Sequence, residues 1–497
     1  MGKYSVPEEI RKLRPRGTTV KKVKGHYYVY EYSSTSTKQE MSDGSFEWKT
    51  VNKMGPCIGQ ITLEDGFVRN GRELTETDLS VFEYGDYFLI RECAAETRRL
   101  LAEKFSEEEA NQIFSVASIF LAEGFQDMGR LPDVFSESVL SQWYPDVRMG
   151  SDALKTLYAN LGKHGKKPDK FRQNLINNSS KKVAVFRHAN ARPAESGDLS
   201  AYGYKAEKSD NEQMNRMTAY DTETQLPLYN EMLIGSDPDE AAAEGMFSWF
   251  HFSDTLFLIG AEFSTEKDKA LFSENGNTYI VPMLPGQEDY EAIYEAVEFD
   301  EQKTFTYEKD GYSSLIRYET YEIEGNPVSY HVFLDTKRQS AERETYIRRM
   351  KAGVKGYTEE GLADSENDFG LIFLETNDLR KTAQEVFTDY QSRRDLETFF
   401  RSVDSNSELN ALDQQDSRNM PGLSFLLQIS GMIFSELRKV LREQAVSVKD
   451  AMFLLSGLKL VKDRNRYVVR NENKERRQLC EKINLNPANH GVQSSTT

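Results

Sequence analysis

Three residues in the last quarter of the chain have types and a spacing that could serve chemistry. Tyr390, Arg393 and Glu397 lie in the segment YQSRRDLETFF, separated by three and four residues. On an α-helix this spacing places all three side chains on one face. A carboxylate is a ligand that hard divalent cations prefer, and an arginine is suited to binding phosphate. The same pattern is also typical of an exposed arginine–glutamate pair on an ordinary amphipathic helix.

Cysteines and histidines show no pattern of a metal or disulfide site. The three cysteines lie far apart in the sequence and form no CxxC pair, so the sequence predicts neither a disulfide framework nor a zinc site. The six histidines form no HExxH motif and show no ligand-like spacing. They are more typical of scattered surface or core residues.

The composition indicates a folded protein without a membrane segment. Of the 497 residues, 38% are hydrophobic and 29% are charged, which is typical of globular and not of disordered chains. No apolar run reaches the roughly 18 residues of a membrane helix, and the longest candidate, Gly422–Leu437, is interrupted by polar residues. The first residues contain no apolar signal-peptide core. We therefore expect a soluble intracellular protein with no membrane partner.

Charge is distributed unevenly along the chain. The net charge is −17, yet residues 1–24 contain eight basic and two acidic residues, a balance of +6 that leaves −23 for the rest. A basic arm on an acidic body is typical of electrostatic contact with nucleic acid, although a solvated, frayed N-terminus would have the same composition. The candidate DNA contacts in this arm are Lys3, Arg11, Lys12, Arg14, Arg16, Lys21, Lys22 and Lys24.

Hydrophobic spacing divides the first half of the chain into segments of different type. Residues 25–32 and 57–68 predict strands of a small β module, separated by the polar stretch 33–49. Helical spacing follows over 72–178. From residue 182 the pattern is three leading strands, then strand, helix and strand, which indicates an α/β core with a mixed sheet. These strands are expected at 182–186, 213–221, 227–235, 255–260 and 278–283, and the helix at 264–276.

The second half of the chain continues this alternation. Residues 303–335 predict three hairpin strands, and 369–377 predict a further strand. A long helix is expected over 379–403, and it includes the Tyr-x2-Arg-x3-Glu spacing. Two amphipathic helices are expected within 420–460.

This order of elements, together with the Tyr-x2-Arg-x3-Glu spacing, resembles the RNase H-like DDE transposases of bacterial insertion sequences. The similarity is greatest to the group with the signature Tyr-x2-Arg-x3-Glu-x6-Lys, and it extends over nearly the whole chain. Segments that match in the correct order include KLRPRGTTVKKVKGHYYVYEY, FSTEKDKALFSENGNTYIVPM, GLIFLETN and MPGLSFLLQISGMIF, as well as DLSAYGYKAEKSDNEQMNRMTAYDTETQLPLYNEMLIGSDPDE. The resemblance implies a mobile-element protein of DNA transposition and recombination, located in the bacterial cytoplasm with the nucleoid.

The chemistry of this family requires carboxylates that the chain has only in part. Two metal ions about 3.5–4 Å apart activate water and then a 3′-hydroxyl at a phosphodiester, and three acids normally hold them. The first acid position is occupied here by Phe186, two residues before His188, and the second by Gly260. Glu397 is present as the third acid, whereas Asp404 replaces the lysine of the signature.

The resemblance assigns roles to the residues that are kept. Glu397 would ligate the metal, Arg393 would contact phosphate or orient Glu397, and Tyr390 would support the DNA end. His188 is more typical of a packed residue than of a metal ligand. The cofactor is Mg²⁺ or Mn²⁺ if the protein is active, and there is none if it is not.

Substitute acids could restore a metal site. Glu262 lies two residues beyond Gly260 and would share its face on a strand. Asp198 or Asp221 could approach from neighbouring segments. This alternative requires two independent relocations, so the departures favour loss of catalysis over its rescue.

We expect an α/β fold with an RNase H-like mixed sheet split by a β insertion, preceded by a small β module and a helical domain, and followed by helices. The function is transposition of DNA by metal-dependent strand cleavage and transfer, or DNA binding by a catalytically dead, domesticated derivative acting as a regulator or decoy. The partner is duplex DNA with the terminal repeats of the element, and the resemblance allows a homodimer. The expected parts are 1–71 (basic arm and β module), 72–178 (helical, DNA-binding), 179–287 (first part of the core), 288–336 (β insertion), 337–412 (second part of the core) and 413–497 (helices and tail).

Overall fold

The chain forms two compact units. The computed structural model describes residues 6–40, 46–69, 79–189, 214–234, 239–309, 311–393, 419–463, 466–489 and 491–492. The first unit comprises Met1–Ser80 with Val461–Arg466, and the second comprises Val81–Leu460 with Tyr467–Thr497. This division places the end of the N-terminal part near residue 80, where the composition had suggested residue 71.

The first unit is an antiparallel sheet with the order β1-β2-β3-β4 and one short helix. Its buried core consists of Ile10 from the helix, Val29 and Ile61. Alternation along β2 directs Val29 toward this core and its neighbours Tyr28 and Tyr30 toward the opposite face. The bounds are α1 (Glu8–Lys12), β1 (Thr18–Val23), β2 (His26–Glu40), β3 (Phe46–Thr62) and β4 (Gly66–Arg69).

Two expectations for this region are wrong. The polar stretch 33–49, expected to separate two strands, belongs largely to β2 and β3, which pair from Tyr27↔Ile61 to Glu40↔Phe46. Sequence periodicity could not detect this ribbon because serine, threonine and lysine occupy both of its faces. The alternative of a frayed N-terminus is also wrong for residues 8–12, which form α1, and for residues 18–23, which form β1.

A helical bundle begins the second unit, as expected from the spacing over 72–178. Its helices surround α15, a helix that is buried along most of its length and packs against α4, α7 and β8. Ser106 and Glu109 form a capping box at the start of α4, which satisfies the free amides of its first turn. The bounds are α2 (Gly85–Cys93), α3 (Ala95–Lys104), α4 (Glu107–Glu123), α5 (Leu131–Glu137), α6 (Leu140–Trp143), α7 (Ser151–Leu161), α8 (Lys167–Asn177) and α15 (Met420–Arg442).

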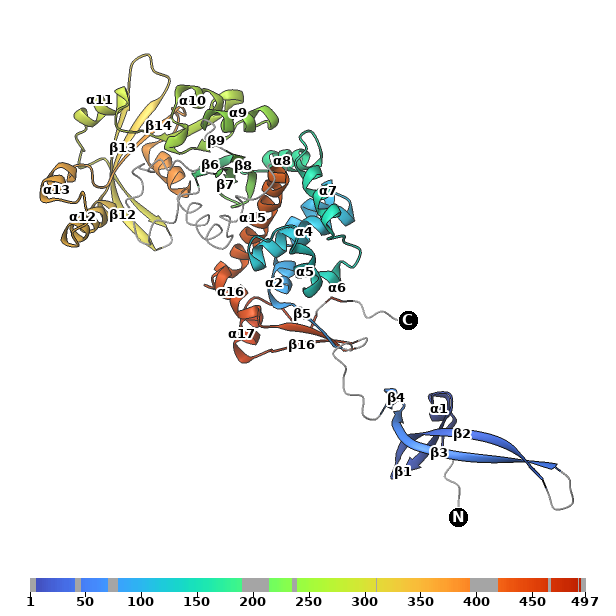
Figure 1. Cartoon of the computed structure of the whole chain (residues 1–497). Coiled ribbons are helices and arrows are strands. Elements are labelled where there is room, and N and C mark those ends of the chain that lie inside the picture. Colours follow the sequence, from blue (N-terminus) through green and yellow to red (C-terminus); the bar gives the residue numbers. More distant parts are fainter. Residues whose placement is uncertain are drawn as a thin grey trace. The chain divides into compact units, whose positions relative to one another are not determined.

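A nine-stranded mixed sheet dominates the rest of this unit (Figure 1). Its order is β11-β12-β13-β14-β10-β9-β6-β7-β8; β6, β9 and β10 are parallel, and all other neighbours are antiparallel. The bounds are β6 (Lys182–Ala189), β7 (Met214–Asp221), β8 (Pro227–Ile234), β9 (Leu256–Leu258), β10 (Thr278–Pro282), β11 (Thr304–Lys309), β12 (Tyr312–Glu322), β13 (Ser329–Asp335) and β14 (Leu371–Thr376).

The expected β insertion is continuous with the core sheet. Its three strands, β11 to β13, join the core through β14, which pairs with β13 on one side and β10 on the other. The sheet is therefore extended and not split. Helices connect its strands: α9 (Asp239–Trp249), α10 (Glu266–Phe272), α11 (Glu288–Ala296), α12 (Thr336–Lys351) and α13 (Glu359–Ser365), with the 3₁₀ turns η2 (Ala261–Phe263) and η3 (Glu274–Gly276).

Helices cover both faces of the sheet near β6 and β9. Phe247 of α9 and Phe272 of α10 pack on Phe257 of β9, on the face that Phe257 shares with Val183. The helical residues 383–393 lie on the opposite face. Helical structure over 383–393 agrees with the helix expected from residue 379, and residues 394–418 lie outside the described part of the chain.

The C-terminal part contains strands that the spacing did not predict. β15 (Lys459–Asp463) pairs with β5 (Leu79–Glu83) and with β16 (Arg466–Arg470) in a three-stranded sheet. In the sequence, α16 (Val448–Leu455) precedes β15 and α17 (Lys474–Lys482) follows β16. This sheet brings together segments from opposite ends of the sequence. α15 is also long and apolar enough to cross a membrane, but 89% of its most apolar window is buried inside the protein, as in the core helix of a bundle.

Candidate functional site

The positions predicted to correspond to two catalytic acids meet at one end of two neighbouring strands. β6 and β9 are parallel, with Ala184 paired to Leu258. Continuing this register by two residues puts Phe186, which is three residues before the end of β6, level with Gly260, which is two residues beyond the end of β9. Alternation along β6 gives Phe186 the same face as Lys182, which is the face covered by residues 383–393.

Arg393 lies directly over this strand end. Its guanidinium carbon is 4.5 Å from the centre of the Phe186 ring and 5.9 Å from that of Tyr390. Its Nη2 is 3.6 Å from Oε1 of Glu262. Arg393 is 6% exposed and Phe186 is 1% exposed, so this is a cation inside the protein, held between an aromatic face and a carboxylate.

The Glu262 carboxylate makes further contacts that hold it beside Arg393. Its Oε1 also accepts a hydrogen bond of 3.2 Å from the backbone N–H of Arg187. The carboxylate folds back over Gly260, where a Cβ would overlap it. Gly260 thus leaves the space in which Glu262 turns toward Arg393, and an aspartate at this position would require the Glu262 side chain to move.

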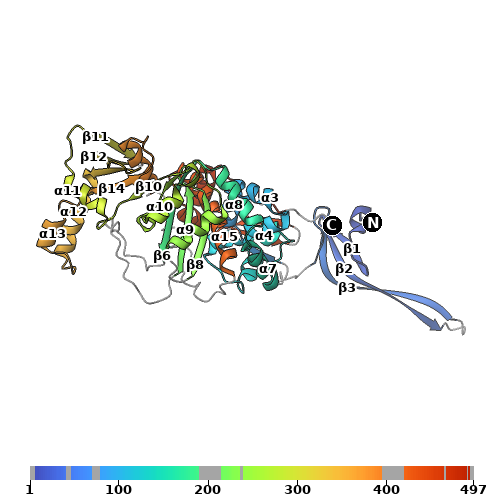
Figure 2. The ribbon, with the colours of Figure 1, turned by 90° about the horizontal axis from the view of Figure 1, so that it is seen from above.

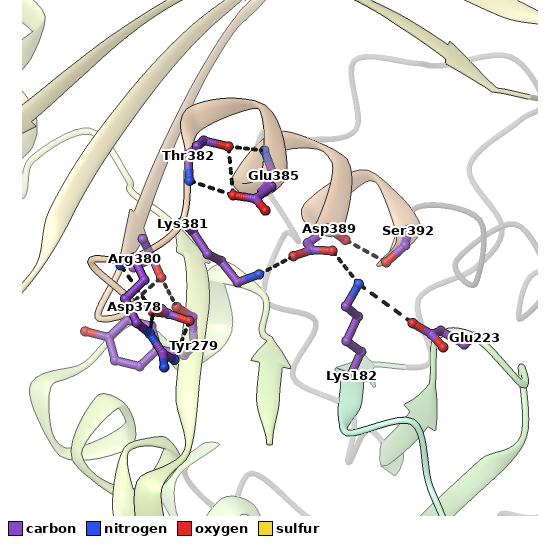
Figure 3. A network of polar contacts seen from close by, with 11 residues as sticks. Lys182, Glu223, Tyr279, Asp378, Arg380, Lys381, Thr382, Glu385, Asp389 and Ser392 are labelled. Atoms are coloured by element: carbon purple, nitrogen blue, oxygen red, sulfur yellow. Dashed lines mark hydrogen bonds and ion pairs between the residues drawn. The ribbon is translucent and has the colours of Figure 1, made fainter. Parts of the chain in front are cut away.

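Asp389 fixes the helix that presents Arg393 (Figure 3). One of its oxygens is 2.9 Å from Nζ of Lys182 at the start of β6, and the other is 2.8 Å from Nζ of Lys381. Lys182 is also 3.7 Å from Glu223. Burial lowers the pKa of Lys182, but Asp389 and Glu223 outweigh this effect and hold that pKa above its ordinary value.

A capping box starts the same helix. Thr382 accepts from the backbone N–H of Glu385, and the Glu385 carboxylate accepts from the backbone N–H and the hydroxyl of Thr382. The bonds are drawn in Figure 3. Together with the Asp389 ion pairs they set where the helix begins and which face it presents, and this face includes Arg393 one turn beyond Asp389.

Several predicted site residues cannot be placed. Glu397, Asp404, Asp198 and Lys3 lie outside the described residues. His188 belongs to β6, but its side chain is outside the described part. Their roles remain predictions from the sequence.

The structure places Asp221 away from the Phe186 end. Asp221 pairs with Val183 near the start of β6. Its carboxylate accepts hydrogen bonds from the backbone N–H and hydroxyl of Ser180 and from the backbone N–H groups of Glu223 and Thr224. These hydrogen bonds give Asp221 a structural role in the β7–β8 turn.

The described residues do not fit a pair of divalent metal ions. Phe186 and Gly260 offer no ligand atoms in their side chains, and Glu262 is already paired with Arg393. Within the described ranges, no group of three or more His, Cys, Asp or Glu side chains is arranged to hold a metal. The positive charge at this strand end is supplied by Arg393.

Sequence reasoning missed Lys182, Lys381 and Asp389. Asp389 directly precedes Tyr390, and its spacing of four from Arg393 was visible as a helical neighbour. Its two lysine partners are not predictable from spacing, since one is eight residues earlier and the other more than two hundred residues away. Only the packing of the helix on β6 brings them together.

Seven of the eight predicted DNA contacts lie in the described part of the first unit. Arg11, Lys12, Arg14, Arg16, Lys21, Lys22 and Lys24 are all exposed. Nζ of Lys21 is 5.7 Å from the centre of the Tyr30 ring, and Nζ of Lys22 is 5.4 Å from that of Tyr27. The lysines of β1 are thereby held beside the aromatic residues of β2.

Comparisons with known proteins give little further guidance. No family model matches the sequence, and no curated protein matches it. Among solved structures, the chain is similar to the piggyBac transposase synaptic complex with hairpin DNA, with a TM-score of 0.36, 10% sequence identity, and coverage of 75% of this chain and 80% of that one. Similarity at this level does not assign a fold or a function.

Proposed function

We propose that this chain is a transposase-type protein that binds duplex DNA and does not cleave it. The observation that supports this proposal is the position of Arg393. On an α/β core, the guanidinium lies where the resemblance places the metal-binding acids, and it is paired there with Glu262.

The strand order supports an RNase H-like core. Within the nine-stranded sheet, β8-β7-β6-β9-β10 has three antiparallel strands followed by two that are parallel to the first. This is the arrangement expected from three leading strands and then strand, helix and strand. With β6 and β9 adjacent and parallel, Phe186 and Gly260 lie on the two strands that would supply the first two acids of a DDE transposase.

Charge at this strand end argues against cleavage. Two divalent cations bring a charge of +4, which three carboxylates and the phosphodiester normally offset. Here the first two positions are Phe186 and Gly260, and the neighbouring Arg393 adds a further positive charge. Metal ions would have to give up water ligands for too few oxygens beside a resident cation, so Glu397 alone would not hold the pair.

The first unit supports DNA as the partner. Four of its exposed basic residues belong to folded elements, Arg11 and Lys12 to α1 and Lys21 and Lys22 to β1. Neutralising phosphates releases counterions and provides most of the affinity for DNA of any sequence. Membership of the bacterial insertion-sequence group, a location at the nucleoid and a homodimeric state belong to the same proposal.

The test uses a labelled duplex that carries the repeats flanking the gene. We expect the protein to bind it and to leave both strands intact in Mn²⁺. Replacing Lys21, Lys22 and Lys24 by glutamine should lower the slope of log affinity against log salt by about one unit for each phosphate that is no longer neutralised. The control replaces Lys449, Lys474 and Lys482, three exposed lysines of the C-terminal part of the second unit, and should leave the slope unchanged.

Cleavage would contradict this proposal. If the unaltered protein cuts the duplex and Glu397→Gln abolishes the cut, the acids lie elsewhere, and an active enzyme using Glu262 becomes the better assignment. Absence of any binding to the duplex would remove DNA as the partner.

A further inference from the structure

We propose that the β2–β3 ribbon lies in the major groove of duplex DNA and contacts base edges through one of its faces. This inference rests on the proposed function for the choice of DNA as partner. It adds which element contacts the bases and which side chains do so.

The ribbon extends beyond the rest of its sheet. β1 pairs with β2 only from Thr18↔Glu31 to Val23↔His26, and β4 pairs with β3 only over Gly59–Thr62. From Tyr32↔Met54 to Glu40↔Phe46, the described residues provide no third strand on either edge. Figures 1 and 2 both show this part of β2 and β3 running out from the small sheet.

The extended part is exposed on both faces and carries large apolar side chains. Trp48 is 67% exposed, Met54 48% and Tyr32 39%. A two-stranded ribbon without a covering layer is only marginally stable in water. Exposed apolar residues gathered on such a ribbon are typical of a surface that becomes covered by a partner.

One face of the ribbon combines these apolar residues with neutral hydrogen-bonding groups. The pairs Tyr32↔Met54, Ser34↔Asn52 and Ser36↔Thr50 follow one another at alternate positions, and Trp48 pairs at the next such position, with Lys38. Alternation places them on a common side. We call the set Tyr32, Ser34, Ser36, Trp48, Thr50, Asn52 and Met54 the reading face.

The chemistry of the reading face suits base edges. Asparagine pairs with the N6 and N7 atoms of adenine, hydroxyls bond to any base, and apolar side chains contact the methyl group of thymine. Ser36 Oγ and Thr50 Oγ1 lie 3.1 Å apart and bond to one another, and each hydroxyl retains further hydrogen-bonding capacity.

Charge indicates that the partner covering the reading face is nucleic acid and not the apolar surface of a protein or a membrane. Residues 1–69 contain twelve basic and eight acidic residues, a balance of +4, which leaves −17 − 4 = −21 for the rest of the chain. The positive balance comes from residues 1–24, next to the ribbon in sequence, whereas residues 32–54 contain three basic and three acidic residues. Lys21 and Lys22 pair with Tyr28 and Tyr27, four and five residues before the ribbon begins at Tyr32, and would contact phosphates beside the groove that the ribbon enters.

The dimensions of the ribbon also fit. A major groove about 12 Å wide admits a two-stranded β-ribbon. Nine strand residues from Tyr32 to Glu40 rise about 30 Å, which is close to one turn of B-DNA, about 34 Å. Register shifts at Tyr30 mark bulges where the ribbon leaves the sheet, and bulges increase the bend and twist of a strand.

The test compares two double variants of the full chain. Trp48→Ala with Asn52→Ala alters the reading face, and Thr35→Ala with Val51→Ala alters a directly paired position on the opposite face. The probe is a fluorescein-labelled duplex of about three helical turns, of mixed sequence. We expect the reading-face variant to bind about tenfold more weakly, and the opposite-face variant to stay within about twofold of the unaltered protein.

A second readout reports the groove. Guanine N7 lies in the major groove, so the unaltered protein should protect this atom from dimethyl sulfate, and the reading-face variant should not. All four residues are exposed, so both variants should keep the melting temperature of the unaltered protein.

The inference fails in two recognisable ways. If the unaltered protein binds the duplex and both variants bind equally well, or if guanine N7 stays reactive, the ribbon does not read the groove and the proposed function stands. The inference also fails if a single strand of the same sequence binds as tightly as the duplex. If the unaltered protein binds neither form of DNA, the proposed function falls together with this inference.

Discussion

At the scale of single residues, Arg393 shows how a buried cation is accommodated. A charged group that leaves water needs a counter-ion and hydrogen bonds, or it destabilises the fold by several kcal/mol (about 3–5 when a buried pair is broken). Glu262 provides the opposite charge at 3.6 Å, and the Phe186 ring provides a negative face at 4.5 Å. The phenylalanine at a predicted acid position therefore has a structural partner.

We predict that Arg393 and Glu262 are energetically coupled. Glu262→Gln should lower the free energy of unfolding because it removes a negative charge 3.6 Å from a buried guanidinium. The double variant Glu262→Gln with Arg393→Met removes both charges. A double-mutant cycle in urea should give a coupling free energy of about 1–2 kcal/mol. Additive effects of the two single changes would show that the 3.6 Å contact is not a stabilising one.

Part of this site was predictable at the residue scale and part was not. The spacing in YQSRRDLETFF selected Tyr390 and Arg393, and counting along the strands selected Phe186, Gly260 and Glu262. The structure brings these five residues together. That Glu262 turns back over a glycine to reach Arg393 depends on the backbone after β9, which residue spacing does not describe.

At the scale of elements, the helix over 383–393 is fixed to the sheet by ion pairs of limited exposure. Asp389 is 7% exposed and accepts from two lysines on different segments, Lys182 and Lys381. The ion pair of Asp389 with Lys182 of β6 determines which residues of the helix face Phe186.

We predict that Asp389→Asn destabilises the fold and loosens this helix. The change removes the carboxylate that Lys182 and Lys381 share and leaves Lys182 with only the longer contact to Glu223. We expect the free energy of unfolding to fall by about 1–3 kcal/mol. Backbone amides of 383–393 should exchange hydrogen faster. Arg380→Ala is the matched control, because the Arg380 side chain in the ion pair with Asp378 is exposed. This change should alter the free energy of unfolding by less than about 0.5 kcal/mol. Equal effects of the two changes would contradict the role given to Asp389.

The strands of the core were predictable as elements because they follow simple patterns. The segments that became β6, β9, β10 and β14 are short apolar runs, as buried strands require. The extended part of the β2–β3 ribbon was not predicted because neither of its faces is buried, so its apolar and polar residues do not alternate. The sheet of β5, β15 and β16 was not predicted because its pairing joins distant parts of the sequence. Alternation identifies a strand only where one of its faces is buried.

At the scale of the whole molecule, the two units have cores of very different size. The buried core of the first unit consists of Ile10, Val29 and Ile61, whereas the core of the second extends through its helices and its nine-stranded sheet. Small domains bury a smaller fraction of their surface and are correspondingly less stable.

We predict that the two units unfold separately. In rising urea, amides of β1 to β4 should lose protection from hydrogen exchange at a lower concentration than amides of α15, which is buried along most of its length. Mass spectrometry of peptides from the two regions measures this directly. Loss of protection at a single concentration for both would show that the chain unfolds as one cooperative unit.

The continuous sheet has a mechanical consequence. β14 is hydrogen-bonded to β13 of the expected insertion on one side and to β10 of the core on the other, so the two parts form one stiff plate and not two bodies joined by a tether. A force applied to β12 would be transmitted through backbone hydrogen bonds to the strand ends at Phe186 and Gly260. Any partner held by β11 to β13 would therefore stay at a fixed distance from that end, because a swing of one part against the other would have to break the β10–β14 ladder.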